Sequence, residues 1–107
     1  MRVIGGTLKG RRLSTIKADA NMGTLRPTTD RIRESLFNIL FGGKFDFKIE
    51  RTRVLDIFAG TGALGVEAIS RGAKTCTFIE KNNACLQILK ANIDLCNIEE
   101  KTTIKIC

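Results

Sequence analysis

The spacing of apolar residues predicts an alternation of strands and helices in the second half of the chain. Short apolar runs bounded by glycine or polar residues predict strands, and apolar residues three and four positions apart predict helices. The predicted order is strand Arg53–Phe58, a tight loop at Gly60–Gly62, helix Ala63–Arg71, strand Thr75–Glu80, a helix from Asn82 or Asn83 to about Cys96 with Leu86, Leu89 and Ile93 on its inner face, and strand Thr102–Ile106. Connections of this length imply a parallel sheet with right-handed crossovers, which places the chain in the α/β class.

The first half of the chain has a different pattern. Gly5-Gly6 and Gly10 interrupt β-prone residues within positions 2–13, which predicts a small hairpin or bent ribbon. Residues 14–27 have no periodicity and are expected to form a loop. A helix follows, with Thr28 or Thr29 as its cap and Gly42-Gly43 as its stop. Its expected buried stripe is Ile32, Leu36, Ile39 and Leu40, with Phe37 and Phe41 beside it, and Arg31, Arg33, Glu34 and Asn38 largely off it.

Charge also separates the two halves. The chain carries a net charge of +7, and all of this excess lies in residues 1–53 because residues 54–107 are neutral. This asymmetry favours a polyanion such as a nucleic acid as the partner of the first half, with a merely solvated basic surface as the alternative. No apolar stretch has the length of a membrane span or a signal peptide, so we expect a cytoplasmic protein. The 4 cysteines, without histidine, match no zinc spacing and are expected to be reduced and buried.

A glycine motif follows the strand predicted at 53–58. Gly60, Gly62 and Gly65 form Gly-x-Gly-x-x-Gly at the start of a helix, a context typical of nucleotide-binding turns. Glu80 ends the next strand, where it can accept hydrogen bonds from both ribose hydroxyls of an adenosine. Asp56 favours S-adenosylmethionine, since a carboxylate opposes a pyrophosphate but attracts a sulfonium and an ammonium group. A glycine turn that only caps a helix is the alternative.

Two segments together resemble a known family. Residues 56–62 (Asp-Ile-Phe-Ala-Gly-Thr-Gly) are similar to the first motif of class I methyltransferases. Residues 26–38 (Arg-Pro-Thr-Thr-Asp-Arg-Ile-Arg-Glu-Ser-Leu-Phe-Asn) resemble the signature of the bacterial family that methylates the exocyclic amine (N2) of a guanine in 16S ribosomal RNA. Residues 2–6 and 9–13 are similar to the start of that family. The resemblance covers nearly the whole chain in order, which makes it far more specific than a lone glycine motif.

The resemblance implies an architecture and a set of site residues. It implies a Rossmann-like class I methyltransferase half-sheet preceded by a β-ribbon and a helix, with residues 1–52 facing RNA and residues 53–107 forming the first half of the cofactor domain. Its expected cofactor is S-adenosylmethionine and its expected partner is ribosomal RNA or the assembling small subunit, with no metal and no membrane. The expected cofactor-binding residues are Asp56, Phe58, Gly60, Thr61, Gly62, Glu80, Lys81 and Asn82. The expected nucleic-acid-binding residues are Lys9, Arg11, Arg12, Arg26 and Arg31. Phe58 as plain core, and Arg31 and Arg33 as solvated helix charges, are alternatives.

One part of the family pattern is absent from these residues. Family members carry Asp/Asn-Pro-Pro-Tyr after a fourth strand, which the resemblance assigns to binding the flipped guanine, whereas Pro27 is the only proline here. We therefore expect the N-terminal portion of an enzyme, inactive by itself. Alternatives are an adenine-specific DNA or RNA methyltransferase, a non-catalytic nucleic-acid-binding module and a dinucleotide-dependent oxidoreductase. Strand 53–58, lacking a fourth-strand neighbour, predicts self-association through Val54, Leu55 and Ile57, unless the basic front segment covers it.

Overall fold

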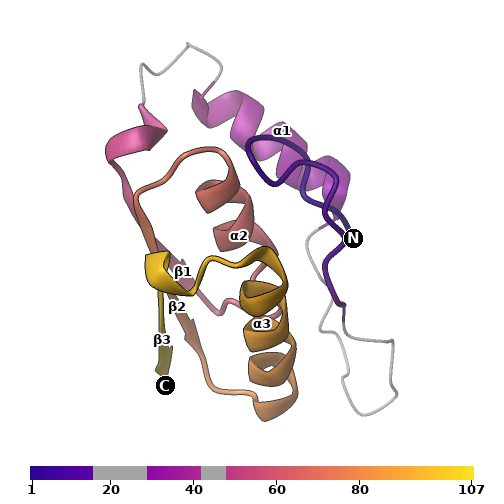
Figure 1. Cartoon of the computed structure of the whole chain (residues 1–107), viewed down its shortest axis with the longest axis vertical. Helices are drawn as coiled ribbons and strands as arrows, with labels where there is room; N and C mark the ends of the chain where they lie inside the picture. Colours follow the sequence, from indigo (N-terminus) through magenta and orange to yellow (C-terminus); the bar gives the residue numbers. More distant parts are fainter. Residues whose placement is uncertain (16–28, 42–47) are drawn as a thin grey trace.

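The computed structural model describes residues 1–15, 29–41 and 48–107, which form an α/β arrangement of a parallel sheet and helices. The described elements are α1 (Asp30–Phe41), the 3-10 turn η2 (Ile49–Arg51), β1 (Arg53–Ile57), α2 (Ala63–Ser70), β2 (Thr75–Glu80), α3 (Asn83–Cys96), the 3-10 turn η3 (Glu99–Lys101) and β3 (Thr102–Ile106). The strands pair in parallel in the order β1-β2-β3 (Figure 1). The predicted β-α-β-α-β order and fold class are confirmed.

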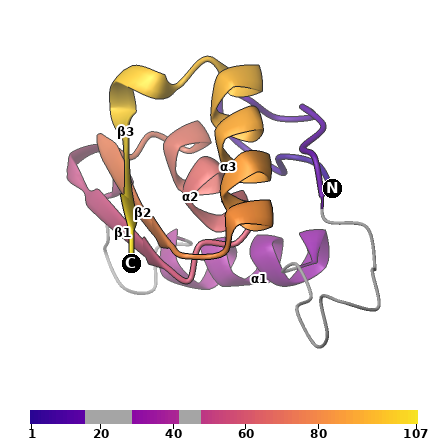
Figure 2. The ribbon, with the colours of Figure 1, turned by 90° about the horizontal axis from the view of Figure 1, so that it is seen from below.

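The helices cover one face of this sheet. Figure 2 shows α2 and α3 against the sheet, with the N-terminal residues on the far side of these helices. Val66 of α2, Phe78 of β2 and Leu89 of α3 are fully buried where these layers meet. Leu55 and Ile57 alternate with the helix-facing positions of β1 and are 55% and 54% exposed on the other face of the sheet. The second face of β1 is therefore largely exposed at these two positions.

Local sequence signals set the ends of α3. The Asn82 side chain accepts a hydrogen bond from Cys85 N–H at 3.0 Å and caps the first turn, as predicted. Asn97 adopts a left-handed backbone with φ 57° and ends the helix. The expected inner face of Leu86, Leu89 and Ile93 is confirmed, since all three are buried. All four cysteines are free, with Cys76, Cys85 and Cys96 buried and Cys107 exposed.

Residues 1–13 form the predicted bent ribbon. Val3 N–H donates to Arg11 O at 2.9 Å, Gly10 N–H donates to Val3 O at 2.8 Å, and Leu13 N–H donates to Met1 O at 2.8 Å. These bonds bring two short segments together in antiparallel orientation. Val3 and Leu13 are buried against the helices. The ribbon is therefore a hairpin that packs on the body of the protein through its own apolar residues.

The orientation predicted for α1 is wrong. Arg33, expected off the buried stripe, is fully buried, and Phe37 is 6% exposed. Ile32 and Ile39 are both 58% exposed and Leu36 is 39% exposed. The cause is a charged partner on α2, Glu67, which lies 3.5 Å from the Arg33 guanidinium and turns that side of α1 inward.

The start of α1 agrees with the prediction at Thr29. Its hydroxyl oxygen accepts a hydrogen bond from Ile32 N–H at 3.2 Å, so Thr29 is the N-cap. The alternative cap Thr28, most of the predicted loop and the predicted stop at Gly42-Gly43 lie in residues 16–28 and 42–47, outside the described part of the chain.

Candidate functional site

The chain turns sharply between β1 and α2. Phe58 follows β1 with φ 59°, a left-handed conformation that is strained for a bulky residue. Its side chain is 87% exposed. Ala59 N–H donates to Ile79 O at 3.0 Å, which ties the turn to the end of β2. The alternative that Phe58 belongs to the core is wrong, and a strained, exposed aromatic at this place is typical of a ligand-binding turn.

The glycines of this turn have different surroundings. A Cβ atom built on Gly60 meets nothing within 4 Å, so the backbone there faces open space that a ligand can approach. A Cβ atom on Gly62 falls 2.3 Å from Leu89 Cδ1, and Gly62 also has φ 85°. Gly62 is therefore required for packing on α3, whereas Gly60 leaves room above the loop.

Glu80 lies at the carboxyl end of β2 and faces this loop. Its Oε1 atom accepts a hydrogen bond from Gly60 N–H at 2.8 Å, and its Oε2 atom accepts from Lys81 and Asn82 N–H, both at 2.9 Å. Burial works to raise the pKa of Glu80, but these amides and the Lys81 charge outweigh it and lower the pKa. Glu80 is thus held ionised, in a fixed orientation, and only half-buried.

Asp56 lies on β1, on the helix-facing side of the sheet. Its Oδ2 atom accepts a hydrogen bond from Gly65 N–H in the first turn of α2 at 3.1 Å. It also borders a mainly apolar cavity of about 230 Å³ between α1, β1 and α2. Burial raises the pKa of Asp56 to about 6, the Gly65 amide opposes this shift, and the charge of Glu80 adds to it. This carboxylate is therefore destabilised at neutral pH and favours a cationic ligand group nearby.

The other expected cofactor residues lie close to these carboxylates in the chain and in space. Thr61 is buried, and its carbonyl accepts a hydrogen bond from the Asn92 side chain at 2.9 Å. Lys81 and Asn82 follow Glu80 directly and are exposed, with Asn82 also capping α3. The structure thus brings a strained turn, an open glycine and two carboxylates to the carboxyl ends of β1 and β2, where parallel α/β sheets bind ligands.

The expected RNA-binding residues occupy the ribbon and α1. Lys9, Arg11 and Arg12 are all exposed on the ribbon. Arg11 Nη1 donates to Leu95 O near the end of α3 at 3.0 Å, so part of its charge compensates the carbonyl end of that helix. Arg31 is exposed on α1, and Arg26 lies outside the described residues.

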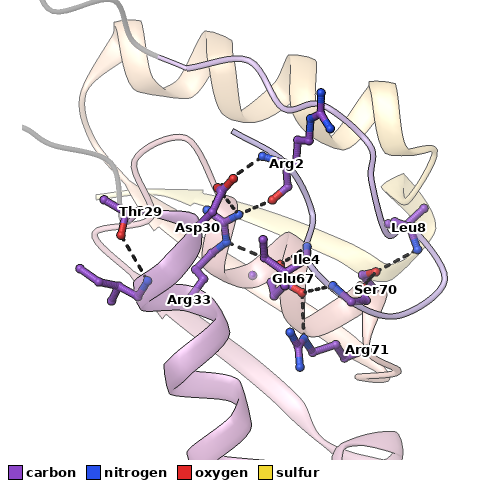
Figure 3. A network of polar contacts seen from close by, with 12 residues as sticks. Arg2, Ile4, Leu8, Thr29, Asp30, Arg33, Glu67, Ser70 and Arg71 are labelled. Atoms are coloured by element: carbon purple, nitrogen blue, oxygen red, sulfur yellow. Dashed lines mark hydrogen bonds and ion pairs between the residues drawn. The ribbon is translucent and has the colours of Figure 1, made fainter.

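Two buried polar side chains were missed by the sequence interpretation. Glu67 on α2 and Asn92 on α3 are both 0% exposed. Glu67 joins the ribbon, α1 and α2 in the network drawn in Figure 3. The signal for Glu67 was an acid inside the otherwise apolar helix 63–70. The signal for Asn92 was a polar residue at a position that continues the buried stripe of α3.

Residues 1–15, 29–41 and 48–107 contain neither a candidate metal cluster nor a membrane-spanning helix. Within them, no group of three or more histidine, cysteine, aspartate or glutamate residues could hold a metal ion. No helix in that part of the chain is long and apolar enough to cross a membrane.

Comparison with known proteins gives a family and close structural relatives. The model of the family described as Conserved hypothetical protein 95 matches residues 1–106. Ribosomal RNA small subunit methyltransferase D of Escherichia coli K12 is 45% identical over 93 residues, covering 87% of this chain and 42% of that protein. The Haemophilus influenzae protein of the same name is 39% identical over 106 residues, covering 97% of this chain and 50% of that protein.

Solved structures share the fold. An Escherichia coli protein described as a methyltransferase superposes with TM-score 0.75 at 38% identity, covering 97% of this chain and 50% of that one. A hypothetical protein of Thermus thermophilus gives TM-score 0.78 at 29% identity, covering 100% of this chain and 55% of that one. The Rossmann-like methyltransferase fold is confirmed, and the chain spans about half the length of the curated relatives it matches.

Proposed function

We propose, from the premise that this chain belongs to the Conserved hypothetical protein 95 family, that it is the cofactor-binding and RNA-facing part of an S-adenosylmethionine-dependent ribosomal RNA methyltransferase. The observation that carries this proposal is the pair of carboxylates at neighbouring strand ends, with Glu80 bonded to the open backbone at Gly60 and Asp56 bonded to Gly65. The names of the curated relatives support ribosomal RNA as the substrate class. Such a substrate is found in the cytoplasm.

The two carboxylates have separate tasks in this proposal. Glu80 is oriented by three backbone amides, one on Oε1 and two on Oε2, so that Oε1 can still accept a hydrogen bond from a ribose hydroxyl. Asp56, buried and poorly compensated, attracts the positively charged methionine end of the cofactor. Phe58, Thr61, Lys81 and Asn82 shape the rim of the pocket. S-adenosylmethionine supplies a methyl group bound to a sulfonium, which a nucleophilic amine accepts.

The finer parts of the proposal concern the acceptor. We propose the exocyclic amine of a guanine in 16S ribosomal RNA, on the resemblance of residues 26–38 to the family signature. In this proposal residues 1–52 face the RNA and residues 53–107 hold the cofactor. The 107 residues are expected not to transfer methyl groups by themselves, because they hold no Asp/Asn-Pro-Pro-Tyr motif to shape a pocket for the guanine.

Calorimetric titration tests the cofactor assignment. The chain is titrated with S-adenosylmethionine, S-adenosylhomocysteine and NAD, and we expect binding of the first two and none of NAD. Glu80→Gln should weaken binding of both sulfur ligands, because a neutral amide is a poorer acceptor for the ribose hydroxyls. Glu99→Gln, an exposed charge change on η3, is the matched control. A preference for NAD would refute the assignment, and RNA binding without cofactor binding would favour a non-catalytic nucleic-acid-binding module.

Salt dependence tests the RNA surface. Each phosphate contact contributes about 0.7–0.9 to the slope of log affinity against log salt concentration. Replacing Lys9, Arg11 and Arg12 by alanine should flatten this slope for a labelled RNA hairpin. The matched control replaces Lys90, Lys101 and Lys105, which are exposed on α3, η3 and β3 and carry the same total charge. An unchanged slope in the ribbon variant would place the RNA surface elsewhere.

A further inference from the structure

The ribbon, residues 1–13, is tied to α2 by two buried side chains. Ile4 N–H donates to Glu67 Oε1 at 2.9 Å, and Gly5 N–H donates to Glu67 Oε2 at 3.0 Å. Leu8 N–H donates to Ser70 Oγ at 2.9 Å, and the Ser70 hydroxyl donates to Gly5 O. Figure 3 shows the ribbon passing directly over these two side chains. The bend of the ribbon therefore depends on acceptors that α2 supplies.

Two guanidinium groups complete the surroundings of Glu67. Arg33 Nε of α1 lies 3.5 Å from Glu67 Oε1, and Arg71 Nε donates to Glu67 Oε2 at 2.8 Å. Arg33 also donates to Arg2 O of the ribbon and, at 2.7 Å, to Asp30 Oδ1. Glu67 thus accepts three hydrogen bonds, from two backbone amides and from Arg71, and forms an ion pair with Arg33. All of these partners belong to the protein and the side chain is fully buried, so the role of Glu67 lies in what it holds together.

The geometry of α2 connects this network to residues 58–62, the proposed cofactor loop. A Cβ atom on Gly65 would fall 2.3 Å from Phe78 Cε1, so Gly65 faces the sheet. Glu67 is two residues later, about 200° around the helix, and faces the ribbon. Gly62, which ends the loop, is about 7–8 Å from Glu67 along the helix axis. One short helix therefore carries the loop at its start and the ribbon anchor in its second turn.

Asn92 provides a second, independent link between the same two parts. Its Nδ2 atom donates to Thr61 O of the loop at 2.9 Å and to Ser14 O, directly after the ribbon, at 3.0 Å. Its Oδ1 atom accepts from Ser14 N–H at 2.7 Å. The loop and the end of the ribbon are thus separated by a single side chain, which is fully buried.

We infer that Glu67 is a positioning residue that fixes the basic ribbon relative to the cofactor loop, so that RNA phosphates held by Lys9 and Arg12 set where the acceptor base meets the cofactor. This inference rests on the proposed function. A buried ion pair contributes little net stability compared with apolar packing, and its best-attested benefit is a defined geometry. A network of this kind at the joint between two binding surfaces serves that purpose.

The test separates orientation from charge and from folding. Glu67→Gln keeps the shape of the side chain and makes the protein more positive, so charge alone would strengthen RNA binding. We expect instead a loss of about fivefold or more in affinity for a labelled RNA hairpin, and a salt slope lower by about 0.7–0.9, equivalent to one phosphate contact. Affinity for S-adenosylhomocysteine should stay unchanged. Ser70→Ala, which leaves the ion pairs intact, should show a smaller loss of RNA affinity in the same direction. Glu99→Gln is the charge-matched control.

A double-mutant cycle decides between positioning and general stability. In a chain that already lacks the basic side chains of Lys9, Arg11 and Arg12, Glu67→Gln should cause no further loss of RNA affinity. An additive loss, or equal losses of RNA and cofactor binding with no effect of Ser70→Ala, would overturn the inference. If the triple alanine variant itself binds RNA like the wild type, the proposed RNA surface fails. If that variant is weakened while Glu67→Gln and Ser70→Ala are not, the positioning inference alone fails.

Discussion

Two buried carboxylates, Glu67 on α2 and Asp56 on β1, differ in how completely the protein satisfies them. Glu67 accepts from two backbone amides and faces two guanidinium groups. Asp56 accepts from one amide, that of Gly65, among the described hydrogen bonds, and borders an apolar cavity. The pKa of Asp56 is raised to about 6 by burial, only partly opposed by that amide and reinforced by Glu80. A carboxylate compensated by two amides and two guanidinium groups holds structure together, whereas one left undersatisfied at a strand end is available to a ligand.

Removing the satisfied carboxylate should have the largest effect. Glu67→Ala leaves the fully buried Arg33 and the nearby Arg71 without their shared counter-charge. Breaking a buried pair in this way costs about 3–5 kcal/mol of unfolding free energy, a large share of the stability of a small domain. Urea denaturation followed by circular dichroism measures the loss. Glu99→Ala, on the exposed turn η3, should change stability by less than about 0.5 kcal/mol. A loss below about 1 kcal/mol for Glu67→Ala would show that the network is dispensable.

Two glycines in the loop between β1 and α2, Gly60 and Gly62, differ in a similar way. Gly62→Ala introduces a Cβ atom 2.3 Å from the buried Leu89 at a left-handed φ of 85°, so it should cost about 2–3 kcal/mol. Gly60→Ala has a left-handed φ of 58° but open space around its Cβ atom, so it should cost only about 1 kcal/mol. Cofactor affinity should nevertheless fall in Gly60→Ala, because the new methyl group occupies the space above the loop. Thermal unfolding measures the loss of stability, and calorimetry measures the loss of cofactor affinity. Equal losses of stability in the two variants would contradict the conclusion that Gly62 is required for packing and Gly60 is not.

Sequence patterns predicted the parts of this molecule that depend on neighbouring residues. Asn82 caps α3 and Gly62 begins α2 for reasons that lie within a few positions of the chain. The strands 75–80 and 102–106 were predicted to the residue for the same reason. An acid within an apolar helix is a local signal that Glu67 is unusual, but it does not identify the partners at residues 4, 5 and 33, which are distant in the sequence.

The error in α1 follows from this non-local partner. Ile32, Leu36 and Ile39 have helical spacing and were assigned to the core on apolar character. In the folded chain, the ion pair between Arg33 and Glu67 lies on the inner side of the helix, and Ile32 and Ile39 face outward. Asn92 was missed for the same reason, since the carbonyl groups to which it donates belong to residues 14 and 61, far away in the sequence. The residues proposed to bind the cofactor, between positions 56 and 82, cluster because consecutive parallel strands end at one edge, a rule that sequence alone can supply.

Removing the charge of Asp56 should raise the free energy of unfolding, whereas removing Glu67 should lower it. A pKa raised from 3.8 to about 6 means that ionised Asp56 penalises the folded state, fully above pH 6 and progressively less as pH falls toward 3.8. Asp56→Asn keeps an acceptor for Gly65 N–H without that charge. We expect it to stabilise the chain by about 1–3 kcal/mol at pH 8 and by much less at pH 4. Urea denaturation at the two pH values is the measurement.

Ligand binding should respond to the same substitution in the reverse direction. In the wild type, affinity for S-adenosylmethionine should rise as pH increases through about 6, because the ionised carboxylate attracts the cationic ligand. Asp56→Asn should bind more weakly at pH 8 and lose this pH dependence. The neighbouring Glu80 has a lowered pKa and stays ionised over the same interval, so it does not mimic the effect. Unchanged binding by Asp56→Asn would mean that Asp56 only caps α2.

The smallest expected effect on stability concerns the exposed face of the sheet. Leu55 is 55% exposed there, and Thr103 occupies the same row two strands away, through the pairing of both residues with Thr77. Leu55→Lys and Thr103→Lys therefore add the same charge to the same face and should each change unfolding free energy by less than about 0.5 kcal/mol. We expect the chain to self-associate through β1 at micromolar concentration, because β1 pairs with β2 alone among the described strands and an open apolar strand edge is a template for pairing. Sedimentation should then show dissociation in Leu55→Lys but not in Thr103→Lys. A monomer at every concentration, with the amides of residues 54–57 protected from exchange, would instead mean that the basic front segment shields β1 within each chain.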